Sequence, residues 1–128
     1  MLPRWAGWNA RRREIAERYL AGLDHPRVAP LPVPAACRPV WHLFPVRVAE
    51  APRQGLLDHL RAEGVLGLVH YPVAMPDQPC LAGREVHSWD GLPRARALAA
   101  AEVSLPITPD LTDSEVDRVV AAVNSWRP

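Results

Sequence analysis

The sequence predicts an α/β (α+β) fold, in which a small sheet of roughly three strands packs against four short helices that lie mainly on one face. Three observations support this prediction. Apolar residues recur at helical spacing in several segments, short β-branched runs alternate with them, and proline-rich stretches separate the two. Helices this short cannot cover both faces of the sheet. The 128 residues, 1–128, fit one domain with a modest core.

The first helix is expected over residues 4–23. Its buried face is predicted from four apolar side chains spaced by a helical turn or two, namely Trp8, Ile15, Tyr19 and Leu23. Gly22 lies near the expected end and is a candidate helix stop. Residues 24–39 hold five prolines, which excludes helix and central strand, so an extended connector is expected there.

Alternating side chains over residues 40–48 predict the first clear strand. Pro45 lies inside it and cannot donate a hydrogen bond to a neighbouring strand. An edge position or a bulge is therefore expected. His42 falls on the more apolar side of the alternation. We interpret it as a hydrogen-bonded core histidine rather than a ligand or catalytic group.

The second half of the chain continues the alternation of helix and strand. A leucine stripe predicts a helix over 51–64 that ends at Gly64, and residues 65–69 predict a short buried strand. A third helix is expected from residue 92, followed by a brief strand that ends at 104–106. Thr112 and Glu115 form a capping-box pattern at the start of the last helix. Its buried stripe is predicted from Val116, Val119, Val120 and Val123.

Composition excludes several classes of partner. The net charge is +1 and residues 11–13 are the only basic cluster, which argues against nucleic-acid binding. No apolar run approaches the length that spans a bilayer, and the first residues lack a secretory signal, so we expect no membrane partner and a cytoplasmic location. Cys37 and Cys80 are not arranged as a redox or metal pair, which favours reduced thiols.

The chain contains no lysine; all fifteen basic residues are arginine. No side chain can therefore form a Schiff base with a carbonyl cofactor, because a guanidinium group stays protonated. No phosphate-binding glycine loop and no metal-binding spacing of histidines is present. A Cys80 nucleophile with His70 as base is conceivable but disfavoured. A triad of His87, Ser88 and Asp90 is disfavoured because the three lie too close in sequence.

Four segments in order carry a family resemblance: RRREIAERYLAGL, VWHLFPVRV, GVLGLVHYPVAMPDQPC and SLPITPDLTDSEVDRVVAAV. The chain resembles, from Arg11 to Val123, the carboxyl-terminal domain of the DegT/DnrJ/StrS family. These are nucleotide-sugar aminotransferases of the aspartate aminotransferase superfamily, fold type I, that depend on pyridoxal phosphate (PLP). The resemblance implies that a large amino-terminal domain, absent here, holds the cofactor and its lysine, while the small domain closes over the substrate.

The resemblance also marks candidate site residues. The family's tyrosine-rich loop corresponds to His70, Tyr71 and Pro72, which implies that His70 and Tyr71 are substrate-binding residues at the mouth of the active site. The alternative, that this loop only packs against the large domain, stays open. Pro76 stands where the family usually has a second histidine, so a contact from that position is in doubt.

The segment GWNAR, residues 7–11, is similar to a family motif that reaches a neighbouring subunit's cofactor phosphate. In the family this motif precedes the arginine-rich helix by about two dozen residues, whereas here the arginines follow at once. We interpret it as a chance match and assign Asn9 and Arg11 no site.

The resemblance implies that the chain is the carboxyl-terminal part of a PLP-dependent nucleotide-sugar aminotransferase and is catalytically inactive by itself. It binds no cofactor alone, although PLP serves the full-length family. Its expected partners are a large-domain chain or a second copy in a homodimer, and a nucleotide-sugar substrate. Two alternatives remain: a separately encoded subunit that completes an aminotransferase, and a non-catalytic binding or regulatory module.

Overall fold

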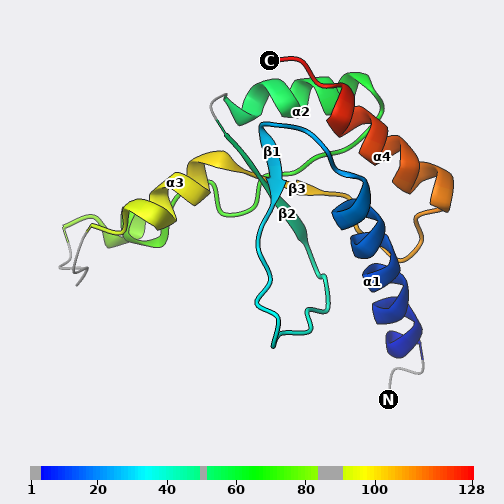
Figure 1. Ribbon diagram of the computed structural model, residues 1–128. Coiled ribbons are helices and arrows are strands. Elements are labelled where there is room, and N and C mark those ends of the chain that lie inside the picture. Colours follow the sequence, from blue (N-terminus) through cyan, green and yellow to red (C-terminus); the bar gives the residue numbers. More distant parts are fainter. Residues whose placement is uncertain (1–3, 50–51, 84–90) are drawn as a thin grey trace.

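The computed structural model describes residues 4–49, 52–83 and 91–128 of the chain (Figure 1). The elements run in the order α1 (Trp5–Gly22), β1 (Val28–Pro30), β2 (Phe44–Val48), α2 (Arg53–Ala62), α3 (Pro93–Ala101), β3 (Glu102–Leu105) and α4 (Asp113–Ser125). Two short 3-10 turns, Met75–Asp77 and Pro79–Leu81, lie between α2 and α3. This mixed architecture with one small sheet confirms the predicted fold class.

The three strands form an antiparallel sheet in the order β1-β2-β3, so β2 is its central strand. The edge position expected from Pro45 is therefore wrong. Pro45 lies opposite Ser104 of β3, and its carbonyl accepts a hydrogen bond from Leu31 N–H on the β1 side. Backbone groups of one residue in an antiparallel strand point the same way. The nitrogen of Pro45, which has no hydrogen to donate, therefore points toward the end of β1. The hydrogen bonds between β2 and β3 do not need this donor and are unaffected.

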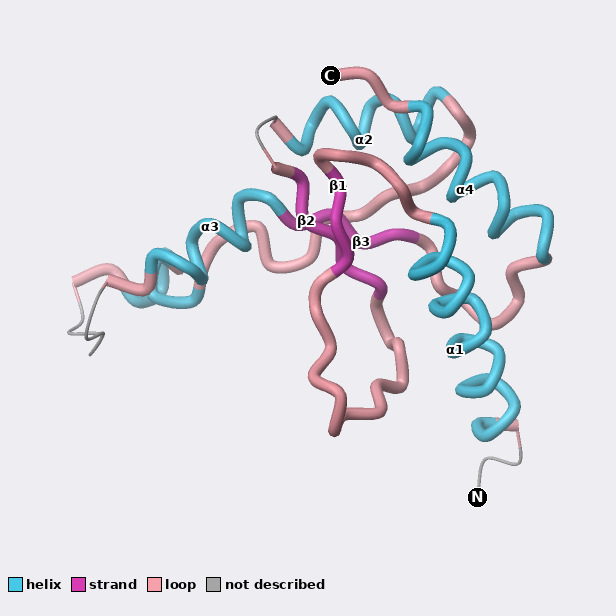
Figure 2. Tube along the Cα trace, viewed as in Figure 1, coloured by secondary structure: helices cyan, strands magenta, loops and turns pink. Residues whose placement is uncertain are grey.

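The two faces of β2 have different neighbours. Phe44, Val46 and Val48 are buried in the core with α1, α2 and α4. The alternate residues, Pro45 and Arg47, face the other side. α3 contacts β2 and extends away from the other three helices (Figure 2), and none of its own residues is buried. Three helices therefore cover one face, as predicted, while α3 and the 3-10 turns extend away from the sheet.

The core is anchored where α1 meets β2. Tyr19 is fully buried, and its ring meets the ring of Phe44 edge-on with centroids 5.0 Å apart. The Tyr19 hydroxyl donates a hydrogen bond of 2.7 Å to the carbonyl of Pro106, so its polar end is satisfied. Burial raises the pKa of Tyr19 well above its usual value. Tyr19 thereby links α1 to both β2 and the segment that follows β3.

Arginines join α1 to α4. Arg11 donates to the carboxylate of Asp113 and to the carbonyl of Leu111, each at 2.7 Å, and Arg18 pairs with Asp113 and Asp117. The hydrogen bond from Arg11, together with the charge of Arg18, holds the pKa of Asp113 below its usual range. These pairs are partly exposed and give orientation more than stability. Arg11 is therefore occupied in helix packing in this chain.

Several local predictions are confirmed. The capping box of Thr112 and Glu115 is formed, and Val116, Val119 and Val123 are buried as expected. Gly64 follows α2 with a φ of +74°, the left-handed conformation that glycine adopts readily. α1 ends at Gly22, as expected, and a Cβ added there would lie 3.0 Å from a methyl group of Val120, so this glycine also allows α1 and α4 to approach closely.

Other local predictions are wrong for tertiary reasons. Trp8 is 41% exposed because the first turns of α1 extend beyond the sheet (Figure 1). Residues 40–43 lie outside β2, and His42 is exposed rather than in the core. Residues 65–69 form no strand; only one bridge pairs Leu68 with Ser104, and the side chains of Leu66 and Leu68 are exposed. The exclusion of helix and central strand from residues 24–39 is confirmed, and this connector contributes β1 as an edge strand.

Within the described ranges, no helix has the length and apolar character needed to cross a membrane. The same residues contain no cluster of histidine, cysteine and acidic side chains that could hold a metal ion.

Replacing Phe44 with alanine is expected to lower the free energy of unfolding by about 3–5 kcal/mol, because the ring is fully buried between Tyr19 and Trp41. Urea denaturation followed by circular dichroism measures this loss. Leu66→Ala serves as the control, since that side chain is 65% exposed and its loss should change stability by about 0.5 kcal/mol or less. Equal effects of the two substitutions would contradict the described core.

Candidate functional site

A groove of about 500 Å³ lies on the outer side of the sheet, opposite the core. Its floor includes Pro45 of β2 and Leu43, which precedes that strand, and α3 forms one wall with Leu98 and neighbouring alanines. The segment from His70 to Gln78 forms the other wall. Most of these side chains are apolar, with a few polar groups at the base, which is the usual composition of a small-molecule site.

The polar base of the groove is a connected network. The hydroxyl of Ser104 donates to one oxygen of the Glu102 carboxylate, and the backbone N–H of His70 donates to the other at 2.9 Å. The ring Nδ1 of His70 lies 3.0 Å from the Ser104 oxygen. Glu102 and Ser104 are almost completely buried, whereas His70 is half-buried and reaches the groove.

This network defines the protonation of the His70 ring. Because the Ser104 hydroxyl gives its only proton to Glu102, its oxygen must accept the bond from His70. Nδ1 therefore carries a proton. The ring is held through Ser104, whose hydroxyl is itself bonded to the buried carboxylate of Glu102, and among the residues that the structure describes no hydrogen bond is formed with the second ring nitrogen, Nε2.

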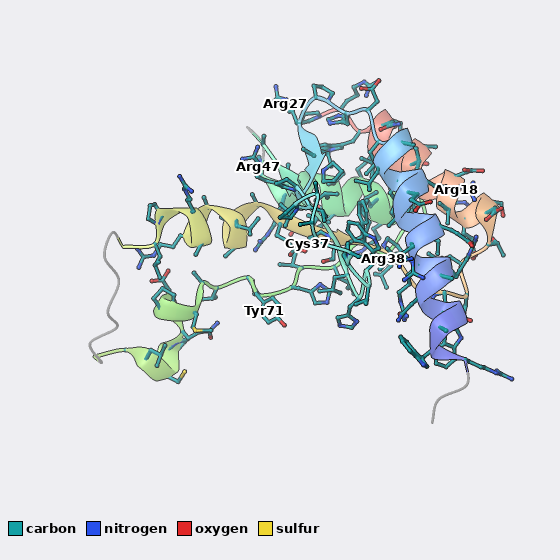
Figure 3. The ribbon with its side chains drawn as sticks, turned by 60° about the horizontal axis from the view of Figure 1, so that its bottom comes forward. Arg18, Arg27, Cys37, Arg38, Arg47 and Tyr71 are labelled. Atoms are coloured by element: carbon teal, nitrogen blue, oxygen red, sulfur yellow. The ribbon has the colours of Figure 1, made fainter. Side chains whose placement is uncertain are left out.

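Tyr71 extends from the same segment without support from neighbours. Its side chain is 80% exposed, and Figure 3 shows it pointing outward from its segment, away from α3 in that view. Its φ is +56°, an unfavourable conformation for a bulky residue. Trp41 and Leu92 have similar values, +51° and +52°, and strained backbone of this kind is frequent at active sites and ligand clamps. The predicted pair of site residues thus shares one groove, with His70 fixed and Tyr71 at the rim.

An ion pair holds the two walls of the groove together. Arg96 of α3 binds both oxygens of Asp77 in the first 3-10 turn, at 2.7 and 2.8 Å. The hydrogen bond from Arg96 keeps the pKa of Asp77 below its usual range. A further bond from Arg53 of α2 to the carbonyl of Ala99 ties the end of α3 to the main body.

The other sequence candidates do not join this groove. Cys80 is exposed and forms no hydrogen bond with His70, whose Nδ1 is occupied by Ser104. His87, Ser88 and Asp90 lie outside the described residues. Asn9 and Arg11 lie on α1, where Arg11 pairs with α4. Pro76, in the first 3-10 turn, is half-buried and does not line the groove.

Residues 1–124 match the DegT/DnrJ/EryC1/StrS aminotransferase family. The chain belongs to this family. A dTDP-3-amino-3,4,6-trideoxy-alpha-D-glucose transaminase of Streptomyces venezuelae is 43% identical over 120 residues, which are 93% of this chain and 31% of that protein. A dTDP-3-amino-3,6-dideoxy-alpha-D-galactopyranose transaminase of Aneurinibacillus thermoaerophilus is 36% identical over 92% of this chain and 31% of its own length.

Solved structures of the family have the same fold. The crystal structure of S. venezuelae DesV in complex with a ketimine intermediate superposes with a TM-score of 0.88 at 40% identity, covering 98% of this chain and 33% of that one. A family aminotransferase from Brucella abortus gives a TM-score of 0.80 at 26% identity, covering 91% of this chain and 30% of its own. The resemblance drawn from the sequence motifs is confirmed, and this family member spans about a third of the length of its relatives.

Sequence reasoning missed Glu102 and Ser104 as members of the site. A signal was present, because two polar residues at alternate positions of a short strand must lie on the same face. The sequence does not show that His70 lies over that face, so the two polar residues could not be assigned to its site.

We expect nitrogen-resolved NMR at about pH 8.5, where an ordinary histidine ring is neutral, to show His70 protonated at Nδ1 and not at Nε2. Ser104→Ala removes the acceptor and should shift the ring toward the Nε2–H form. Ser114→Ala, at an exposed position in α4, is the control and should leave the His70 signals unchanged. An Nε2-protonated ring in the unaltered chain would contradict the network.

Proposed function

We propose that this chain is the carboxyl-terminal part of a PLP-dependent nucleotide-sugar aminotransferase, with no transaminase activity by itself. The observation that carries the proposal is the family match over residues 1–124, combined with relatives that act on dTDP-linked amino sugars and are about three times as long. No observation favours a separately encoded subunit or a regulatory module over this proposal.

The side chains of this chain do not fit the cofactor. Covalent attachment of PLP needs an amine on a side chain, and the sequence holds fifteen arginines and no lysine. A guanidinium group stays protonated and cannot replace that amine. The amine must therefore come from a polypeptide segment outside these 128 residues, and no step of the reaction is assigned to residues of this chain.

We further propose that His70 and Tyr71 contact the nucleotide-sugar substrate in the complete enzyme. Support comes from the groove that they share, from the buried Glu102 and Ser104 that orient His70, and from the strained, exposed Tyr71. Apolar walls with a few fixed polar groups suit a deoxysugar, whose ring carries both methyl and hydroxyl groups.

The exposed apolar side chains of α1 fit an assembly with another polypeptide. Trp5, Trp8 and Leu20 are 55%, 41% and 48% exposed, and we propose that a large-domain chain or a second copy covers them. The two exposed thiols, Cys37 and Cys80, suit the reducing cytoplasm, where we place the enzyme.

The purified chain, mixed with PLP and treated with borohydride, should show no adduct on any side chain by mass spectrometry, because no side-chain amine is present. Adducts confined to the α-amino terminus are compatible with the proposal. A lysine-containing fragment of the S. venezuelae relative serves as the positive control. A reduced adduct on a side chain, or transamination by the chain with contaminants excluded, would refute it.

A chimera that joins the first two-thirds of the S. venezuelae relative to this chain should be an active transaminase. In it, Tyr71→Gly is expected to raise KM for the nucleotide sugar about tenfold, which corresponds to the loss of about 1.4 kcal/mol of binding. Glycine tolerates the positive φ at this position, so the fold should be kept. His70→Ala should raise KM similarly.

Arg61→Ala, on the exposed surface of α2, is the control and should leave KM unchanged. A soluble chimera that holds the cofactor but is inactive would refute the family function for this chain. An active chimera whose KM is insensitive to both groove substitutions would refute only the substrate contacts.

A further inference from the structure

A second pocket, of about 250 Å³, adjoins the groove and shares His70 and Leu43 with it. It lies between α1, the residues before β2, the segment that ends at His70, and the residues after β3. Its polar lining consists of Arg12, His42, His70, Ser104 and Thr108. None of the residues that line it carries a carboxylate, and Arg12 supplies a permanent positive charge among side chains that are mostly apolar.

Arg12 is the unusual member of this lining. Its Nε atom is buried and has no hydrogen-bond partner, and within the described ranges its guanidinium forms no ion pair. Two other arginines of α1, Arg11 and Arg18, pair with acids of α4. A buried, unpaired donor on a cation is costly, and such groups are normally satisfied by a partner or a bound ion.

We propose that Arg12, His42 and His70 form a binding site for a phosphate-type oxyanion. A guanidinium group presents several N–H donors in a fork that matches phosphate oxygens, and imidazole rings add donors when protonated. The buried network contributes geometry, because Ser104 and Glu102 hold Nδ1 of His70, so that Nε2 is the nitrogen that donates to an oxyanion when the ring takes up a second proton. Thr108 donates to Asp110 outside the pocket, so its hydroxyl is not counted among the donors.

The ligand chemistry is shared by two sources, inorganic phosphate and the diphosphate of a nucleotide. The oxyanion site depends only on the pocket and not on the proposed aminotransferase function. Because the pocket adjoins the apolar groove through His70, a nucleotide sugar could place its diphosphate at Arg12 and its sugar beside Tyr71. That extension rests on the proposed function.

The test is an NMR titration of the folded 128-residue chain with inorganic phosphate, thymidine 5′-diphosphate and thymidine. Saturable shifts of the Arg12 Nε–H and of the His42 and His70 rings are expected with the two phosphate compounds and not with thymidine. Arg12→Ala should weaken binding of both by about tenfold or more. Arg13→Ala removes the same charge from the next position on α1, does not line this pocket, and should leave binding unchanged.

His42→Ala provides a second variant, since this exposed side chain can be removed without disturbing the core. It should also weaken phosphate binding if the pocket is the site. Tighter binding of the diphosphate than of phosphate, with added shifts at Tyr71, would support the extension to nucleotide sugars. Binding of phosphate without that preference would support the pocket and refute the extension. No saturable shift at Arg12, or equal losses from Arg12→Ala and Arg13→Ala, would overturn the proposal.

Discussion

The alternation of side chains along β2 is the constraint on which the rest of the structure depends. Phe44, Val46 and Val48 lie on one face of the central strand and form the core with α1, α2 and α4. The residues between them must then point to the opposite face, because successive side chains of a strand alternate. One strand thus provides both the centre of the core and the floor of the groove, and the site is positioned by the same packing that stabilises the fold.

β3 also has one face in the core and one face toward the groove, and polar residues occupy the second face. Val103 and Leu105 join the core, while Glu102 and Ser104 are buried on the outer side beneath His70. Burial of a carboxylate costs free energy unless its oxygens accept hydrogen bonds. One oxygen of Glu102 accepts from the backbone N–H of His70, and the other accepts from the hydroxyl of Ser104. The network therefore fixes the backbone and the ring of His70 together. It gives a rigid polar boundary between an apolar groove on one side and a cationic pocket on the other.

The surface of the chain is consistent with a role inside a larger enzyme. The relatives are about three times as long, the chain has no lysine to hold PLP, and apolar side chains of α1 extend beyond the sheet into solvent. A chain that catalysed transamination by itself would need the missing lysine, and exposed apolar side chains are unfavourable in water unless another polypeptide covers them. Together these features fit the proposal that this chain is the small domain of a longer enzyme.

The sequence by itself determined the fold class, the four helices, the capping box of α4 and the family, because these depend on local spacing and on motifs read in order. It also determined the lack of a Schiff-base amine, which is a matter of composition. Only the tertiary structure decided that Pro45 lies in the central strand, that His42 is exposed, that Glu102 and Ser104 bind His70, and that Arg12 lines the same pocket as His70. Such contacts join residues more than thirty positions apart, and local patterns do not encode which distant segments pack together.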